Sequence, residues 1–193
     1  MDNFTIIDGN KIHYIEEGKG RDVLVLFHGS NFNAMTWVNT GTLQAVSSAG
    51  FRALSVDFPG YGQSQGERQH LSEFVGKFIK ILSDVNRLVL LGASMGGRAV
   101  LEYALSVDGK GLSAVILVGA VGLAENAQRL NSLSRLKVLG IWGSEDRISP
   151  PDNAKYLELV GGKVRIIMGA PHACYLKEPQ KFNEILVDFL RTV

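Results

Sequence analysis

The chain has 193 residues, of which 46% are hydrophobic and 20% charged, and its formal net charge is +1. This composition predicts one folded domain over residues 1–193 and excludes a disordered chain. The near-neutral charge argues against nucleic acid or an anionic membrane as a partner, and no apolar run is long enough to cross a bilayer.

Short apolar runs alternate with longer segments of helical spacing along the chain. The predicted strands, in chain order, are Phe4–Ile7, Lys11–Glu16, Val23–Phe27, Phe51–Val56, Arg87–Leu91, Leu112–Val118, Leu136–Trp142 and Lys163–Met168. The predicted helices are Thr36–Ala49, Leu71–Leu82, Met95–Val107, Leu123–Leu133, Asp152–Val160 and Pro179–Leu190. The first two strands flank Asp8-Gly9-Asn10, which is typical of a hairpin turn.

Strands separated by helices favour a parallel sheet that is covered on both faces. The predicted fold class is therefore α/β, with a mostly parallel sheet of eight strands and helices on both faces. In such sheets ligands bind beyond the carboxyl ends of the strands. The residues that follow the strands are therefore the candidates for chemistry.

A G-x-S-x-G pattern, Gly92-Ala93-Ser94-Met95-Gly96, lies between a predicted buried strand and a predicted helix. The turn there is sharp, and the two glycines relieve the crowding around Ser94. The Ser94 hydroxyl then stands clear of the sheet, near the positive end of the new helix, which predicts a nucleophile. The alternative is a tight turn in which Ser94 merely caps the helix.

His172 follows the last predicted strand, in Met168-Gly169-Ala170-Pro171-His172. A loop histidine at this edge of the sheet can reach Ser94 and accept its proton, as a general base must. The alternative is an exposed loop histidine without such a role. Of the other histidines, His13 and His70 are expected to be surface or structural side chains.

Asp146 follows the penultimate strand and is the candidate acid that orients the imidazole. Its neighbour Glu145 is the reserve. The stretch after the preceding strand, Val118–Gly122, has no carboxylate, which favours Asp146. The alternative is a helix cap or a loop salt bridge, with Arg147 as the partner.

Phe27-His28-Gly29-Ser30 follows the first buried strand. Gly29 lets the backbone turn tightly, so that the N–H of Ser30 can face Ser94. Together with the N–H of Met95 it would give two donors for a developing oxyanion. His28 is expected to fix this loop by hydrogen bonding.

Five motifs occur in order along the chain. They are His28-Gly29-Ser30, Asp57-Phe58-Pro59-Gly60-Tyr61-Gly62-Gln63-Ser64, Gly92-Ala93-Ser94-Met95-Gly96-Gly97, Gly143-Ser144-Glu145-Asp146 and Gly169-Ala170-Pro171-His172. With them the chain resembles the α/β-hydrolase family along almost its whole length. Trp37-Val38-Asn39-Thr40-Gly41-Thr42-Leu43 and His172-Ala173-Cys174-Tyr175-Leu176 are similar to the small branch of abhydrolase-domain-containing protein 14.

The resemblance implies nucleophile Ser94, acid Asp146, base His172 and oxyanion donors Ser30 and Met95. The order of serine, aspartate and histidine is that of the family. One departure is Pro171, which stands where many members have glycine. It stiffens the loop without barring His172 from its place.

The resemblance also implies a serine hydrolase of the carboxylesterase type, which cleaves small acyl esters through an acyl-Ser94 intermediate and needs no cofactor or metal.

Many members carry a helical cap after the strand that here is Leu112–Val118. The segment Gly119–Arg135 has room for one short helix only, so we expect a capless enzyme with a shallow site. The expected walls of the substrate site are Phe32, Phe58, Met95, Val121, Ile148 and Tyr175.

Two other functions would use the same residues or the same fold. An acyltransferase would pass the acyl group of Ser94 to an amine, alcohol or thiol, and a binding protein would have little turnover. A nicotinamide oxidoreductase is disfavoured, because Arg98 stands where a third glycine is wanted and no acidic residue ends the strand Leu112–Val118. The physiological substrate and the oligomeric state stay open.

The N-terminal residues lack the basic and apolar regions of a signal peptide. The single cysteine, Cys174, cannot form an internal disulfide. These features predict a cytoplasmic protein. Although Cys174 is close to His172 in sequence, it is expected to be a buried side chain that behaves as an apolar one.

Overall fold

The computed structural model describes every residue, Met1–Val193, and its centre is one sheet of eight strands. The strands are β1 (Asp2–Ile7), β2 (Asn10–Glu17), β3 (Asp22–Phe27), β4 (Arg52–Val56), β5 (Arg87–Ala93), β6 (Ala114–Val118), β7 (Lys137–Gly143) and β8 (Lys163–Ile167). Every predicted strand is present, with ends that differ by no more than two residues.

The strand order is β1-β2-β4-β3-β5-β6-β7-β8. β2 pairs antiparallel with both β1 and β4, and all other neighbouring strands are parallel. The chain changes direction across the sheet at β3, because the next strand, β4, pairs on one side of β3 and β5 pairs on the other. The sheet is thus mostly parallel, as predicted, and the carboxyl ends of β3 to β8 meet at one edge.

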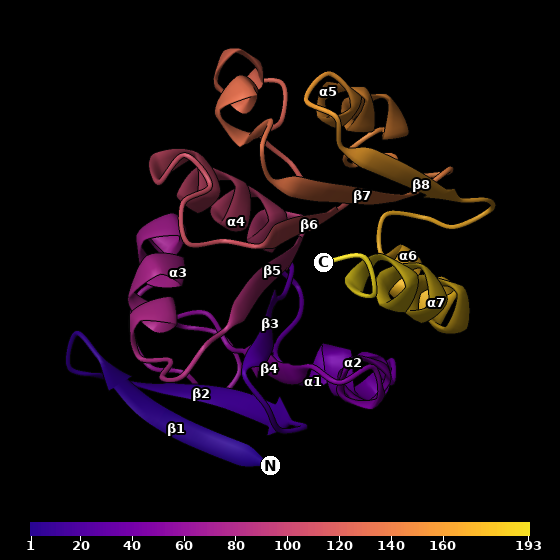
Figure 1. Cartoon of the computed structure of the whole chain (residues 1–193). Helices are drawn as coiled ribbons and strands as arrows, with labels where there is room; N and C mark the ends of the chain where they lie inside the picture. The colour runs from indigo at the N-terminus through magenta and orange to yellow at the C-terminus, as the bar shows by residue number, and fades with distance from the viewer.

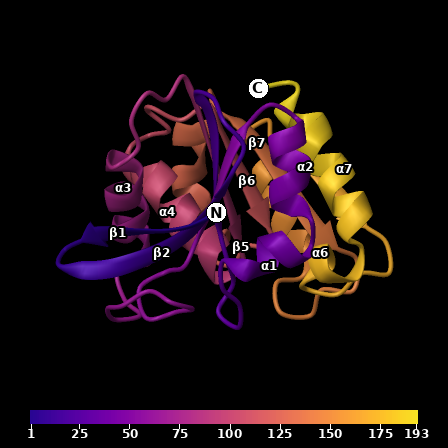
Figure 2. The same ribbon diagram turned by 90° about the horizontal axis from the view of Figure 1, so that it is seen from below.

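Helices cover both faces of the sheet, as Figures 1 and 2 show. The α-helices are α1 (Met35–Asn39), α2 (Thr42–Ser48), α3 (Leu71–Lys80), α4 (Met95–Ser106), α5 (Lys155–Glu158), α6 (Cys174–Lys177) and α7 (Pro179–Leu190). Two 3₁₀ helices, η1 (Ala127–Leu133) and η2 (Pro151–Ala154), complete the set. Helices α3 and α4 lie on one face, and α1, α2 and α7 lie on the other.

The predicted helix Thr36–Ala49 is in fact two helices, α1 and α2. The break falls at Gly41, whose φ of +68° is left-handed and cannot continue a right-handed helix. The predicted helix Leu123–Leu133 is also shorter than expected and is the 3₁₀ helix η1. No larger insertion lies between β6 and β7, so the fold has no cap.

The core consists of two apolar clusters, one on each face of the sheet. Side chains of the central strands alternate between them: Val23, Val25 and Phe27 of β3 join the first cluster, and Leu24 and Leu26 join the second. This alternation follows from the two-residue period of a strand. It explains why these strands are wholly apolar in sequence. None of the helices has the length and apolar character needed to cross a bilayer.

Candidate active site

Ser94 lies at the turn between β5 and α4, in a strained backbone conformation. Its φ of +52° and ψ of −111° are unusual for a residue with a side chain. A Cβ on Gly96 would come within 2.6 Å of the carbonyl oxygen of His28, and one on Gly92 would overlap the backbone of Gly96. The two glycines of the pattern therefore allow the sharp turn, as the sequence predicted.

The Ser94 side chain does not cap α4, because it makes no hydrogen bond to the helix. The capping alternative is therefore wrong. The hydroxyl has no hydrogen-bond partner elsewhere in the chain either, and Ser94 is partly exposed. It is free to react with a bound molecule.

Asp146 and His172 are in direct contact. The Nδ1 of His172 donates to Oδ2 of Asp146 at 2.7 Å, and the histidine side chain is 17% exposed. The other carboxylate oxygen, Oδ1, accepts from the backbone N–H groups of Ile148 and Ser149, both at 2.9 Å. These bonds hold the buried carboxylate in one orientation and leave Nε2 of His172 as the free ring nitrogen.

The salt-bridge alternative for Asp146 and the solvated-loop alternative for His172 are not supported, whereas Oδ1 of Asp146 does accept from backbone N–H groups two and three residues further on. Asp146 forms no salt bridge with Arg147, and His172 is not a solvated loop side chain. Glu145, the reserve acid, is exposed and makes no side-chain bond to the imidazole. Asp146 is thus the carboxylate that the fold brings to His172.

The end of β6, at Val118 and Gly119, lies beside both Ser94 and this pair. The N–H of Ser94 donates to the carbonyl of Val118 at 2.9 Å. A Cβ on Gly119 would lie 3.1 Å from Oδ2 of Asp146 and 3.2 Å from Nδ1 of His172. Ser94 and the Asp146–His172 pair therefore both lie beside the carboxyl end of β6.

The sequence reading missed the role of Gly119, because it examined that stretch only for a missing carboxylate. Gly143, named in the fourth motif, has a role that the sequence did not indicate, because any Cβ there would overlap the backbone carbonyls of Ala170 and Pro171. In both places a glycine at the end of a buried strand was the available signal. Such a glycine allows another segment to approach the strand closely.

Cys174 is buried, as predicted. Burial raises the pKa of its thiol to about 12. The side chain is therefore a neutral thiol near neutral pH and a poor nucleophile. Ser94, in contrast, is partly exposed and its side chain is unbonded.

Two backbone N–H groups beside Ser94 are without partners. The N–H of Ser30 makes no hydrogen bond in the protein, and that of Met95 begins α4, where no acceptor exists within the helix. Gly29 brings the first of them close: a Cβ on this glycine would lie 3.5 Å from Cβ of Ser94. The arrangement suits an oxyanion site.

His28 is completely buried and fixes the loop, as expected. Its Nδ1 donates to the carbonyl of Gly29 at 2.8 Å, and its Nε2 accepts from the N–H of Phe58 at 3.1 Å. This pair of bonds requires the neutral ring with the proton on Nδ1. Burial lowers the pKa of His28 below its ordinary value, which keeps the ring neutral.

The lowered pKa of His28 predicts a loss of stability in mild acid. Below about pH 6.5 the unfolded chain binds a proton at this ring, whereas the folded chain resists it. The free energy of unfolding therefore decreases as the pH is lowered. Urea unfolding at pH 7.5 and 5.5 should show a smaller drop for His28→Asn than for the wild type. Long-range ¹⁵N spectra should show a neutral Nδ1–H ring at pH 6, and an imidazolium signal there would contradict the assignment.

Two of the expected substrate walls are wrong. Phe58 is 0% exposed and stacks on Phe27 at 5.1 Å between ring centroids, inside the first core cluster. Tyr175 is 3% exposed and packs on Trp37 at 4.8 Å, inside the second. Both rings lie within motifs that the sequence analysis singled out, but they pack inward because large apolar side chains are stabilised in the core.

The other expected walls remain at the surface. Phe32, Met95 and Val121 are partly exposed, and Ile148 is 68% exposed. The five most prominent surface cavities do not include Ser94, Asp146 or His172. A cavity of about 350 Å³ lies away from these residues, between the β1–β2 hairpin and α3.

Comparison with known proteins is consistent with this geometry. The model of the alpha/beta hydrolase family matches residues 24–137. Protein ABHD14A of Danio rerio is 31% identical over 90% of this chain and 68% of its own length. Putative protein-lysine deacylase ABHD14B of Homo sapiens is 30% identical over 90% of this chain and 85% of its own.

Solved structures show the same fold. A predicted CIB-like hydrolase from Thermoplasma acidophilum superposes with a TM-score of 0.92, at 28% identity, over 100% of this chain and 98% of that one. An esterase from Exiguobacterium antarcticum superposes with a TM-score of 0.82, at 20% identity, over 99% and 100% of the two chains. The second likeness concerns the fold alone.

Proposed function

The chain belongs to the alpha/beta hydrolase family, and we propose that it is a serine hydrolase that cleaves small acyl esters through an acyl-Ser94 intermediate. The observation that carries the proposal is the 2.7 Å hydrogen bond from His172 to Asp146, beside a strained and unbonded Ser94. A hydrolase is what the family implies. The ester substrate and the covalent step are our inference.

In the proposed reaction, Ser94 Oγ attacks the ester carbonyl while Nε2 of His172 takes its proton. Asp146 keeps the proton of the neutral ring on Nδ1 and stabilises the imidazolium that forms. The N–H groups of Ser30 and Met95 stabilise the oxyanion. His172 then protonates the leaving alcohol, and a water molecule, activated by the same ring, hydrolyses the acyl-enzyme to acid and free Ser94.

A preference for short acyl chains follows from the open site. Each buried methylene contributes about 0.8 kcal/mol, but a site without a cap has little wall to bury a long chain. We expect esters from acetyl to butyryl to have higher kcat/KM than those beyond about C8. Steady-state kinetics on p-nitrophenyl esters from C2 to C12 tests this. A maximum at C10 or C12, or a jump when the substrate forms micelles, would show a deep covered tunnel instead.

A second candidate is the deacylation of acyl-lysine. It is favoured by the 30% identity to a relative named as a putative protein-lysine deacylase, and by the open site, which a bulky peptide can approach. The same residues would act on the amide bond. Parallel assays with p-nitrophenyl acetate and an acetyl-lysine peptide distinguish the two by their kcat/KM.

Two further experiments separate the remaining alternatives. Product analysis with an added amine, alcohol or thiol would show acyl transfer, if the acyl group goes to the acceptor and not to water. Labelling of Ser94 by a fluorophosphonate without turnover of any ester or amide would favour a binding protein on a hydrolase scaffold.

A further inference from the structure

A buried hydrogen-bonded pair, His13 and Asp57, lies behind the loop that carries the Ser30 N–H. His13 lies on β2, and Asp57 directly follows β4. Nδ1 of His13 is 2.8 Å from Oδ2 of Asp57. His13 is 1% exposed and Asp57 is 2% exposed. Of the two expectations for His13, a surface or a structural side chain, the structural one is confirmed, because the side chain is buried. The mechanism proposed above uses neither side chain.

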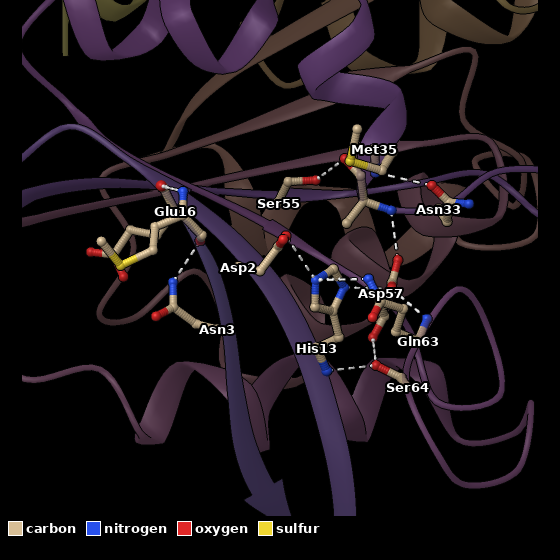
Figure 3. A network of polar contacts seen from close by, with 12 residues as sticks. Asp2, Asn3, His13, Glu16, Asn33, Met35, Ser55, Asp57, Gln63 and Ser64 are labelled. Carbon is tan, nitrogen blue, oxygen red and sulfur yellow. Dashed lines mark hydrogen bonds and ion pairs between the residues drawn. The ribbon is translucent and has the colours of Figure 1, made fainter.

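The carboxylate of Asp57 is fully bonded, as a buried charge requires. Its Oδ2 also accepts from the N–H of Gln63 at 2.8 Å, and its Oδ1 accepts from the N–H of Ala34 at 2.6 Å. Figure 3 shows His13, Asp57, Gln63 and Ser64 facing one another. In the same network Ser64 Oγ accepts from the N–H of His13 and donates to the carbonyl of Asp57.

The bond to Ala34 links this pair to the oxyanion loop, which we define as residues 28–33. At its start, the loop is held by His28, whose Nε2 accepts from the N–H of Phe58. At its end, Ala34 is held on both sides: its N–H by Asp57, and its carbonyl by the hydroxyl of Ser55 at 2.7 Å. Both ends of the loop are therefore hydrogen-bonded to one short segment, residues 55–58.

The Ser30 N–H lies between these hydrogen-bonded ends of the loop and has no hydrogen-bond partner of its own. Its position is thus set by the ends of the loop. We propose that His13 and Asp57 are positioning residues, which hold the oxyanion loop so that the Ser30 N–H points at the oxyanion formed on Ser94. The inference rests on the proposed function.

The proposal predicts a change in kcat more than in KM. A donor that acts on the oxyanion stabilises a charge present only in the transition state, so its displacement leaves substrate binding almost unchanged. Displacements of about 1 Å are enough to lower rates by large factors. Because a smaller folded fraction would also lower the apparent kcat without changing KM, kcat is expressed per titrated active site.

The test compares His13→Leu with His13→Asn. Leucine removes the donor to Asp57, whereas the amide of asparagine can replace Nδ1. We expect His13→Leu to lower kcat for p-nitrophenyl acetate by about 10- to 100-fold with KM changed by less than about twofold, and His13→Asn to recover most of the rate. If His13→Leu does not fold, Asp57→Asn is used, because its amide cannot accept from Ala34, Gln63 and His13 together.

Asp22→Asn is the matched control. Asp22 begins β3 at the opposite edge of the sheet, where it accepts from Arg87 at 2.6 Å and from Asn86 at 2.9 Å. Its replacement also breaks a charged contact but touches no residue of the oxyanion loop. We expect its kcat to match the wild type. If both variants lose kcat in proportion to their loss of melting temperature, the positioning role is refuted.

Amide hydrogen exchange of the peptide covering residues 28–34 gives a readout without substrate. Exchange there should be faster in His13→Leu than in the wild type, with no change in Asp22→Asn. If the wild type turns over no ester or amide, the proposed function fails, but the exchange result still decides whether His13 holds the loop. Unchanged exchange together with unchanged kcat would overturn the inference.

Discussion

Ser94→Ala should lower kcat for p-nitrophenyl acetate by about 10⁴- to 10⁶-fold. The variant loses the oxygen that forms the acyl-enzyme, while the proposed oxyanion donors and the His172–Asp146 pair stay in place. The residual rate is then what these groups give to direct attack by water. Steady-state kinetics with active-site titration of the wild type measures the loss.

The fold should survive this change, because Ser94 makes no side-chain hydrogen bond and alanine is smaller. Circular dichroism and the melting temperature check this. Ser106→Ala is the matched control: it lies at the far end of the same helix, where its hydroxyl donates to the carbonyl of Tyr103, and it should keep full activity. A fluorophosphonate should label the control and not Ser94→Ala. Full esterase activity in purified Ser94→Ala would refute the nucleophile.

Asp146→Asn should lower kcat by up to about 10⁴-fold through the wrong tautomer of His172. The N–H groups of Ile148 and Ser149 both donate to Oδ1, so the asparagine oxygen is expected to stay at that position. Its amide group then faces Nδ1 of His172 and donates to it. The ring proton moves to Nε2, which can no longer accept the proton of Ser94.

Glu145→Gln is the control for this variant, because Glu145 is the adjacent carboxylate and is exposed. It should keep the wild-type kcat. Long-range ¹⁵N spectra of His172 should show the Nδ1–H form in the wild type and the Nε2–H form in Asp146→Asn. If Glu145→Gln is the damaging change and Asp146→Asn is active, the two neighbours have exchanged roles.

The strands were predictable because each is a short apolar run with both faces buried. For example, Leu88, Val89, Leu90 and Leu91 of β5 alternate between the two core clusters, so every position is apolar. The nucleophile turn was predictable for a similar reason. The backbone strain at Ser94 and the glycines that relieve it lie within a few residues of one another.

The helical segments were less predictable. Apolar spacing indicated one helix over Thr36–Ala49, but the left-handed Gly41 divides it. Glycine is tolerated in helices as well as at their ends, so spacing and composition alone did not decide between the two. The contacts of Thr42 and Thr40 with Asn183 of α7, distant in sequence, favour the broken form.

By itself the sequence determined the fold class, the strained turn at Ser94, the absence of a cap and the strand ends at which Asp146 and His172 lie, because each depends on residues close together in the chain. Only the tertiary structure decided which side chains face the site. Phe58 and Tyr175 adjoin site motifs yet pack into the core, and His13 is buried against Asp57, which lies 44 positions further along the chain. Such pairings depend on the order of the strands and on the volume between sheet and helices, which no short stretch of sequence specifies.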